Sequence, residues 1–363
     1  MGQDFWQEAR NATRDRSVPI DILKGLAIIS VILLHSWDSS TLLRLGAPYY
    51  ISQAVPIFII ISGYNGVKSY LRAGATTFGQ CYNNTPRRLS RLIYPYSIIL
   101  AIEILFILFV NLFENNIAGM LASVTGRPLE HIHTVIHEYY GDPHIFTSVI
   151  TGGYGPGSFF VPVLIPLVII LPILYLLARR NLSLMLFGTF CFTLVFEAYA
   201  LKSEMPDWIY RLTFIRYLFA FGLGIWLALG KGRTWSFVGG IMSAIYITGV
   251  NYFGFTPLAQ QSWGSQNALA FVWPLVLVEI GLSVAPKHIG NICIRCISEI
   301  GQASYHIFLI QMVYFWTLGW FINTLSSASF IINVILCVLI GYAFYCVSYS
   351  KAAKGKALKY ESN

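Results

Sequence analysis

The chain has 363 residues, of which 56% are hydrophobic and only 11% are charged. Soluble domains carry about 25% charged residues, so this composition excludes a large soluble protein and indicates a polytopic membrane protein. The net charge of +8 does not indicate a nucleic-acid partner, because most Lys and Arg residues fall in short clusters between apolar runs, as positive-inside topology requires. The sequence therefore predicts membrane lipid, and no nucleic acid, as a partner.

Ten apolar runs of helical length follow a polar and basic N-terminal tail at residues 1–17. Their predicted ranges are about 19–37, 49–67, 92–113, 155–178, 182–201, 212–230, 235–252, 269–284, 303–322 and 331–350. The longest connection, about 114–154, is acidic, whereas Lys or Arg residues follow every second run up to a basic tail at 351–363. This pattern predicts an all-α bundle of about ten transmembrane helices at 18–350, with both termini in the cytoplasm and the long loop outside.

Lys24 and His35 lie within the otherwise apolar first run, eleven residues apart. Eleven helical steps place both side chains on one face, about 16 Å apart along the axis. Lys24 can bind a phosphate or extend to the inner membrane surface, and His35 can act as a general base or serve helix packing. Because ionisable groups inside a span usually mark function, their alignment favours a functional site. Asp38 follows three residues later, on the same side of a continued helix, where it can hold the imidazole tautomer.

Arg87, Arg88 and Arg91 form the densest cationic cluster, directly before the third predicted span. Guanidinium groups match phosphate oxygens, so the cluster is a candidate site for the phosphate groups of a ligand. The alternative interpretation is a positive-inside anchor. Arg211 and Arg216, near the outer end of the sixth span, can bind the phosphate of a substrate that arrives from outside. For Arg216, the alternative is a structural ion pair with Glu197 in the fifth span.

A glycine-rich stretch at 152–158 precedes the fourth span, but it lacks the Lys-Ser/Thr ending of a phosphate loop. We expect it to re-enter the membrane by an irregular path that lines a cavity, with Ser158 as a candidate substrate-binding residue.

Neither the cysteines nor the external histidines predict a metal site. Cys293 and Cys296 have the spacing of half a zinc or redox site without a second pair. The long loop contains metal-binding side chains at His131, His133, His137, Glu138, Asp142 and His144. His-x-His alternation suits a strand, whereas His133 and His137 suit a helix, so no one conformation unites them. We interpret this run as a solvated loop or lid.

Five segments match known signatures, in order. They are IDILKGLAIISVILLH with Lys24 and His35, PIFIIISGYNG, RRLSRLIYPY with Arg88 and Arg91, GSFFVPVLIPL from Gly157, and IGQASYHIFLIQ from Ile300. In this order they resemble the integral-membrane acyltransferase 3 family. Lys24 stands where Arg is commoner, and Gln311 stands where His is common. His306 lies five residues earlier and does not share the face of Gln311.

The resemblance implies transfer of an acyl group, usually acetyl, from cytosolic acyl-CoA to a hydroxyl of a cell-envelope glycan or lipid-linked sugar. It implies acyl-CoA as a co-substrate with no tightly bound cofactor, and a location in the inner or plasma membrane. Coenzyme A would lie at Lys24 and the arginine cluster, while His35 deprotonates the acceptor or carries the acyl group itself. Because no soluble esterase-like domain follows the bundle, a one-part reaction is expected. An exporter of polysaccharide or lipid-linked sugar is the alternative, although no inverted repeat is visible.

Overall fold

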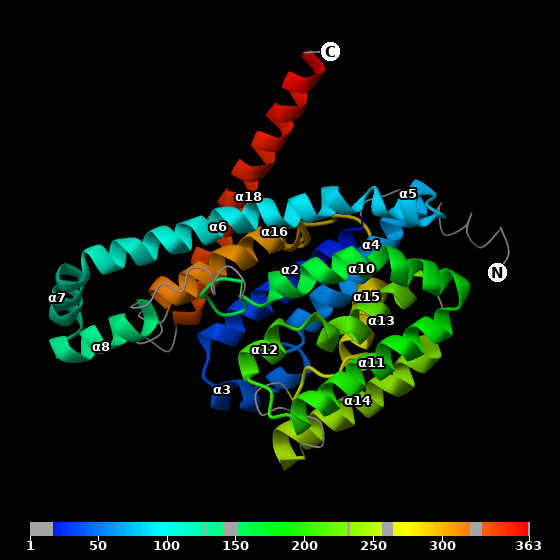
Figure 1. Ribbon diagram of the computed structural model, residues 1–363, viewed down its shortest axis with the longest axis horizontal. Helices are drawn as coiled ribbons and strands as arrows, with labels where there is room; N and C mark the ends of the chain where they lie inside the picture. Colours follow the sequence, from blue (N-terminus) through cyan, green and yellow to red (C-terminus); the bar gives the residue numbers. More distant parts are fainter. Residues whose placement is uncertain are drawn as a thin grey trace.

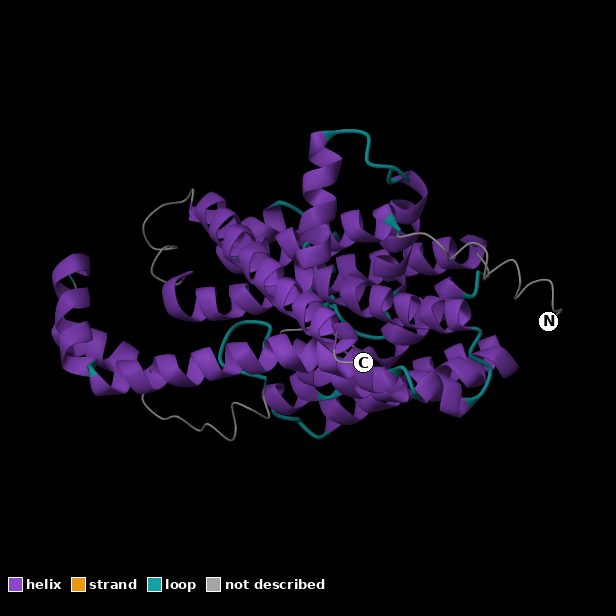
Figure 2. Cartoon of the chain, turned by 90° about the horizontal axis from the view of Figure 1, so that it is seen from above, coloured by secondary structure: helices purple, strands orange, loops and turns teal. Residues whose placement is uncertain are grey.

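The computed structural model describes residues 17–126, 128–140, 152–230, 233–255, 264–319 and 329–361. Within these ranges the chain forms helices and loops and no strand (Figure 2). The helices are α2 (Val18–Ser36), α3 (Ser39–Arg44), η1 (Ala47–Tyr49), α4 (Ala54–Ala73), α5 (Phe78–Tyr82), α6 (Thr85–Leu112), α7 (Glu114–Thr125), α8 (Leu129–Tyr140), α10 (Phe160–Arg180), α11 (Leu182–Lys202), α12 (Asp207–Leu212), η2 (Phe214–Tyr217), α13 (Leu218–Ala228), α14 (Arg233–Phe253), α15 (Val272–Val284), α16 (Ile292–Tyr314), the π-helical η3 (Phe315–Gly319) and α18 (Ser329–Glu361).

Within the described residues, seven helices are long and apolar enough to cross a membrane. They are Val18–Ser36, Ala47–Ala73, Phe78–Leu112, Phe160–Arg180, Leu182–Lys202, Trp235–Phe253 and Ser329–Ser348. The remaining three predicted spans correspond to two shorter apolar helices, Phe214–Ala228 and Val272–Val284, and to α16. The polytopic all-α fold is therefore confirmed. The count of ten crossings, the division into bundle and tails, and the cytoplasmic position of both termini stay predictions.

Two helices begin earlier than the apolar pattern indicates. α6 begins at Thr85, so the arginine cluster lies in its first two turns rather than in a loop. α16 begins at Ile292, where the side chain of Asn291 caps it by accepting a 2.9 Å hydrogen bond from the Ile294 N–H. A proline in the first turn of α6 and the Asn291 cap of α16 suit helix starts that lie before the stretch that hydropathy alone detects.

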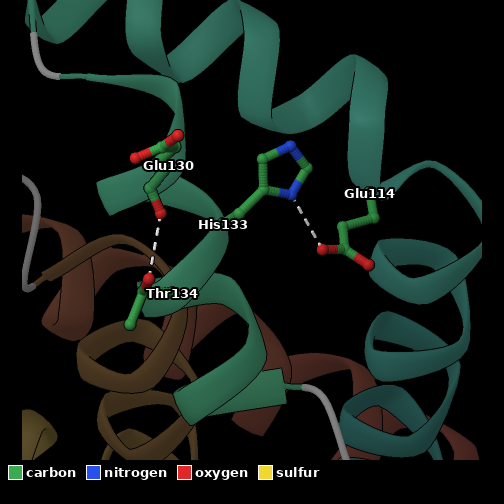
Figure 3. A network of polar contacts seen from close by, with 4 residues as sticks. All are labelled: Glu114, Glu130, His133 and Thr134. Carbon is green, nitrogen blue, oxygen red and sulfur yellow. Dashed lines mark hydrogen bonds and ion pairs between the residues drawn. The ribbon is translucent and has the colours of Figure 1, made fainter.

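The predicted external loop contains two helices, α7 and α8, at the far end of the long α6 (Figure 1). His133 Nδ1 lies 2.9 Å from Glu114 Oε1 and joins the two helices (Figure 3). Among the described residues, no group of three or more His, Cys, Asp or Glu side chains could hold a metal ion. The side chains of His137, Glu138, Asp142 and His144 lie outside the described part.

The helix α2 packs on α4, α15, α16 and α18 and so lies inside the bundle. Two glycines bring α2 and α16 together, because a Cβ atom at Gly25 would collide with the carbonyl of Ile297, and one at Gly301 with the carbonyl of Asp21. Small residues allow this close packing between membrane helices. Further along, the rings of His35 and Phe315 lie 5.7 Å apart. The two helices therefore run in the same direction.

The helix α6 also runs parallel to α16. The hydroxyl of Tyr305 donates a 2.7 Å hydrogen bond to the carbonyl of Leu92, and beyond it the rings of Trp316 and Phe106 lie 5.6 Å apart. Parallel α2, α6 and α16 agree with the predicted alternation, in which they are the first, third and ninth spans. Both α2 and α6 contact α16, so positions along α2 and α6 can be compared by the α16 residues that each contacts.

Candidate functional site

Lys24 and His35 lie on one unbroken helix, as predicted. Pro19 in its first turn suits the helix start, and α2 ends at Ser36, so His35 lies in the last turn. Lys24 Nζ lies 3.0 Å from Asp21 Oδ1, and the Asp21 side chain is only 10% exposed. The two predicted functional groups are about 16 Å apart along the axis. One is held by a buried carboxylate near the beginning of the helix, and the other lies at its end.

The partly buried His35 contacts the end of α16, and its neighbour Ser36 is tied to α18. Asn333 Nδ2 donates a 3.0 Å hydrogen bond to the Ser36 hydroxyl, which itself donates to the Ile32 carbonyl at 2.7 Å. The hydroxyl of Tyr314 donates to Asn333 Oδ1 at 2.6 Å. This series of bonds fixes the ends of α2 and α16 against the beginning of α18, and so fixes the backbone that carries His35.

The prediction for Asp38 is wrong in its geometry. Because α2 ends at Ser36, Asp38 does not share a helix face with His35 but caps α3. Its carboxylate accepts hydrogen bonds from the Ser40 hydroxyl at 2.6 Å and from the N–H and hydroxyl of Thr41 at 2.9 and 2.7 Å. The bonds from Ser40 and then Thr41 lower the pKa of Asp38 below its ordinary value. This exposed residue is engaged in a helix cap.

The arginine cluster divides into one inward-facing residue and two exposed ones. Arg87 and Arg91 are exposed, whereas Arg88 is partly buried against α4. Arg88 Nη2 donates a 2.9 Å hydrogen bond to the Gly66 carbonyl, and its guanidinium lies 4.4 Å from the centre of the Tyr70 ring. Its Nη1 atom is buried and has no hydrogen-bond partner among the described residues. The Nη1 group of Arg88 is thus held in place by the other contacts of this side chain and has no hydrogen-bond acceptor among the described residues.

Positions along α16 relate this arginine to Lys24. Leu92 contacts Tyr305, so Arg88, one turn earlier, lies near the level of Gly301. Gly25, next to Lys24, packs directly on Gly301. The two cations therefore lie at a similar level, some ten to fourteen residues, or about 15–21 Å, before the level at which His35 meets Phe315.

The residues predicted to bind the acceptor substrate lie in different surroundings. Arg211 is exposed on α12, where its Nε lies 2.8 Å from Asp207 Oδ2. Arg216 is fully buried, and its Nη2 donates a 3.3 Å hydrogen bond to the Gln266 carbonyl. Its burial and this bond indicate a structural role for Arg216, which has no surface open to an acceptor, and the ion pair with Glu197 stays a prediction. Ser158 lies partly buried in the glycine-rich segment, which is irregular as expected and precedes α10.

Two residues outside the predicted site also face this segment. Glu103 on α6 lies against Gly153 and Tyr154, and Gln311 on α16 binds the Pro156 carbonyl. The sequence marks Glu103 only as a costly charge inside a span, and Gln311 only as a departure from a family histidine. His306 instead packs among the rings of Tyr305, Phe344 and Tyr345.

The fold and this arrangement define a multi-pass membrane protein with cations at one level of the bundle and a histidine at another. A family model described as "Acyltransferase domain" matches residues 18–346. The chain therefore belongs to the acyltransferase 3 family and is a membrane acyltransferase that transfers groups other than aminoacyl groups. The comparisons with curated proteins and with solved structures gave no match.

Proposed function

We propose that this acyltransferase moves an acetyl group from cytosolic acetyl-CoA to a hydroxyl of an envelope polysaccharide or a lipid-linked sugar. The observation that carries the proposal is the arrangement of Lys24, Arg88 and His35 along parallel helices. A cytosolic donor and an envelope acceptor require the cell's inner or plasma membrane as the location.

Coenzyme A is proposed to bind where Arg88 and Lys24 lie. A buried guanidinium N–H without an acceptor is unfavourable, and a phosphate oxygen would provide a charge-assisted hydrogen bond to Arg88 Nη1. The exposed Arg87 and Arg91 add positive charge beside it. The acyl arm then has to extend about 15–21 Å along the bundle to reach His35.

His35 is the proposed group for proton transfer. Its imidazole takes the proton of the acceptor hydroxyl while the hydroxyl oxygen attacks the thioester carbonyl. The carbon–sulfur bond then breaks, and the leaving thiolate takes the proton from the imidazolium. In the alternative route the imidazole attacks first, releases coenzyme A and passes the acyl group to the acceptor hydroxyl. Both routes need a neutral imidazole at His35. They also need its backbone held in place, and the hydrogen bond between Asn333 and Ser36 holds it.

Purified full-length protein in lipid nanodiscs, incubated with acetyl-CoA labelled in the acetyl group, tests this function. The wild type should give labelled acceptor, labelled enzyme or released acetate. His35→Ala should lower the rate by about 10²- to 10⁴-fold, the range for loss of a general acid–base group. His306→Ala, which removes another intramembrane imidazole, should stay within about threefold of the wild type. Absence of all three products, with His35→Ala altering only export, would contradict the proposal and favour a transporter.

A further inference from the structure

The side chain of Glu103 has an unused hydrogen-bond acceptor inside the bundle. Glu103 is 0% exposed. Its Oε2 accepts a long 3.4 Å bond from the Tyr154 N–H, while its Oε1 has no hydrogen-bond partner within the described ranges. A carboxylate has room for about four hydrogen bonds, and a buried one without partners is costly. This atom therefore indicates a missing donor.

Gln311 presents a second unused acceptor to the same segment. It is also 0% exposed. Its Nε2 donates a 3.0 Å bond to the Pro156 carbonyl, and its Oε1 has no partner in the described part of the chain. Two oxygens from different helices thus lie beside residues 152–158, and each lacks a donor.

The glycines of this segment allow the close approach. Gly153 has φ +109°, and a Cβ atom there would collide with the carboxylate of Glu103. Gly155 lies directly on the backbone of Met312, and Gly157 with φ +86° lies beside Phe308 and Gln311. Left-handed backbone at Gly153 and Gly157 is open to glycine at little cost. The segment is therefore built around the two polar side chains.

The two oxygens lie at the level of His35. Gln311 is one helical turn before Phe315, whose N–H bonds to the Gln311 carbonyl and whose ring contacts His35. Glu103 is one turn before Phe106, which packs on Trp316, and Trp316 stacks on Tyr154 at 5.0 Å. Residues 311–316, where α16 continues into η3, thus connect the contacts of Glu103, Gln311 and His35.

We infer that Glu103, Gln311 and residues 152–158 form a subsite that accepts hydrogen bonds from the hydroxyl groups of the acyl acceptor. The free atoms of Glu103 and Gln311 are both acceptors, and the buried Tyr154 hydroxyl, which also has no partner among the described residues, can donate or accept. Because one acceptor is a carboxylate oxygen, the subsite favours a hydroxyl-rich ligand and disfavours a phosphate. The inference rests on the proposed function and adds the residues that recognise the hydroxyls flanking the acylated one. Glu103 is a binding residue in this arrangement and takes no part in proton transfer.

The test uses the purified full-length protein in nanodiscs with acetyl-CoA. Octyl glucoside is the acceptor probe, and 1-octanol, with the same alkyl chain and a single hydroxyl, is its control. Glu103→Gln should raise KM for octyl glucoside about tenfold or more, as expected for a lost hydrogen bond to a charged group, with kcat within about twofold. KM for acetyl-CoA should not change, and Gln311→Met should show the same pattern. The control variant is Glu279→Gln, because Glu279 also lies in a span but already accepts a hydrogen bond from Ser236.

The outcomes separate this subsite from the proposed function. Equal KM values for octyl glucoside in Glu103→Gln and the wild type would overturn the subsite and indicate that internal water satisfies Glu103. Equal use of octanol and octyl glucoside by the wild type would overturn it as well. The subsite would also be overturned if the wild type hydrolysed acetyl-CoA at the same rate with and without octyl glucoside and transferred no acetyl group to it. If the wild type neither transfers nor hydrolyses the acetyl group, the proposed function itself fails. Parallel changes in kcat, in KM for acetyl-CoA and in unfolding temperature would assign Glu103 a structural role.

Discussion

Two buried glutamates occupy very different surroundings in this bundle. Both oxygens of Glu197 on α11 accept hydrogen bonds from the Ala268 N–H, at 2.9 and 3.2 Å. Nearby, Arg216 lies 4.4 Å from the ring centre of Tyr210 and binds the Gln266 carbonyl. Glu103 on α6 has one long bond and one oxygen without a partner among the described residues. Glu197 and Arg216 hold the same stretch of chain, whereas Glu103 is left to bind something else.

The difference teaches how to interpret intramembrane polar residues. A charge inside a span is costly, and the protein offsets this cost either with its own groups or with a ligand. Glu197 illustrates the first case, because both of its oxygens accept hydrogen bonds from the Ala268 N–H. Glu103 illustrates the second, because its Oε1 is buried and has no hydrogen-bond partner among the described residues.

The largest effect on stability is expected from Arg216→Leu. Removing the buried guanidinium takes the donor from the Gln266 carbonyl and the cation from the rings of Tyr210 and Tyr217, and a buried polar group left without its partner typically costs about 1–3 kcal/mol. The unfolding transition in detergent, followed by circular dichroism against temperature or denaturant, measures this loss. Arg211→Leu breaks only an exposed pair and should cost less than about 1 kcal/mol. A stable Arg216→Leu protein with an increased KM for the acceptor would instead support the predicted acceptor-binding role of Arg216.

A smaller and more selective effect is expected from Arg88→Ala. Loss of charge-assisted bonds to a phosphate is worth about 1.5–3 kcal/mol, so KM for acetyl-CoA should rise roughly ten- to a hundredfold with kcat little changed. Steady-state rates at varied acetyl-CoA concentration measure it. Arg87→Ala, which removes an exposed neighbour from the same helix turn, should change KM less than about threefold. Unchanged KM in Arg88→Ala would place coenzyme A elsewhere.

The sequence predicts the helices better than it predicts their polar contacts. Apolar length and the alternation of basic loops identify α2 as a span and place Lys24 and His35 on one face, because both depend only on local chain geometry. Glu103 and Glu197 look alike in the sequence, since each is one acidic residue in an apolar run. Only the packing shows that Ala268 donates to one and that Gly153 approaches the other. Contacts between distant segments carry the difference, and no local pattern encodes them.

Asp38 shows the opposite error, in which a local pattern predicts too much. The spacing from His35 to Asp38 suits a helix, but the Asp-Ser-Ser-Thr sequence is also a strong N-cap for a new helix, and capping determines the structure. The sequence contains both signals. The cap dominates because the Asp38 carboxylate accepts hydrogen bonds from both Ser40 and Thr41.

The smallest effect is expected from Asp38→Asn, which removes the charge but keeps a good N-cap residue. Since the folded pKa of Asp38 is lowered, its stabilising contribution is present above its unfolded pKa of about 4 and is lost as the pH falls through the folded value. At neutral pH Asp38 is therefore a charged cap. Asp38→Asn should keep kcat within about twofold and leave the pH–rate profile unchanged, because the carboxylate binds α3 rather than the imidazole. A kcat decrease of a hundredfold or more, with a shift in the pH profile, would show that Asp38 acts on His35 and that the cap opens during turnover.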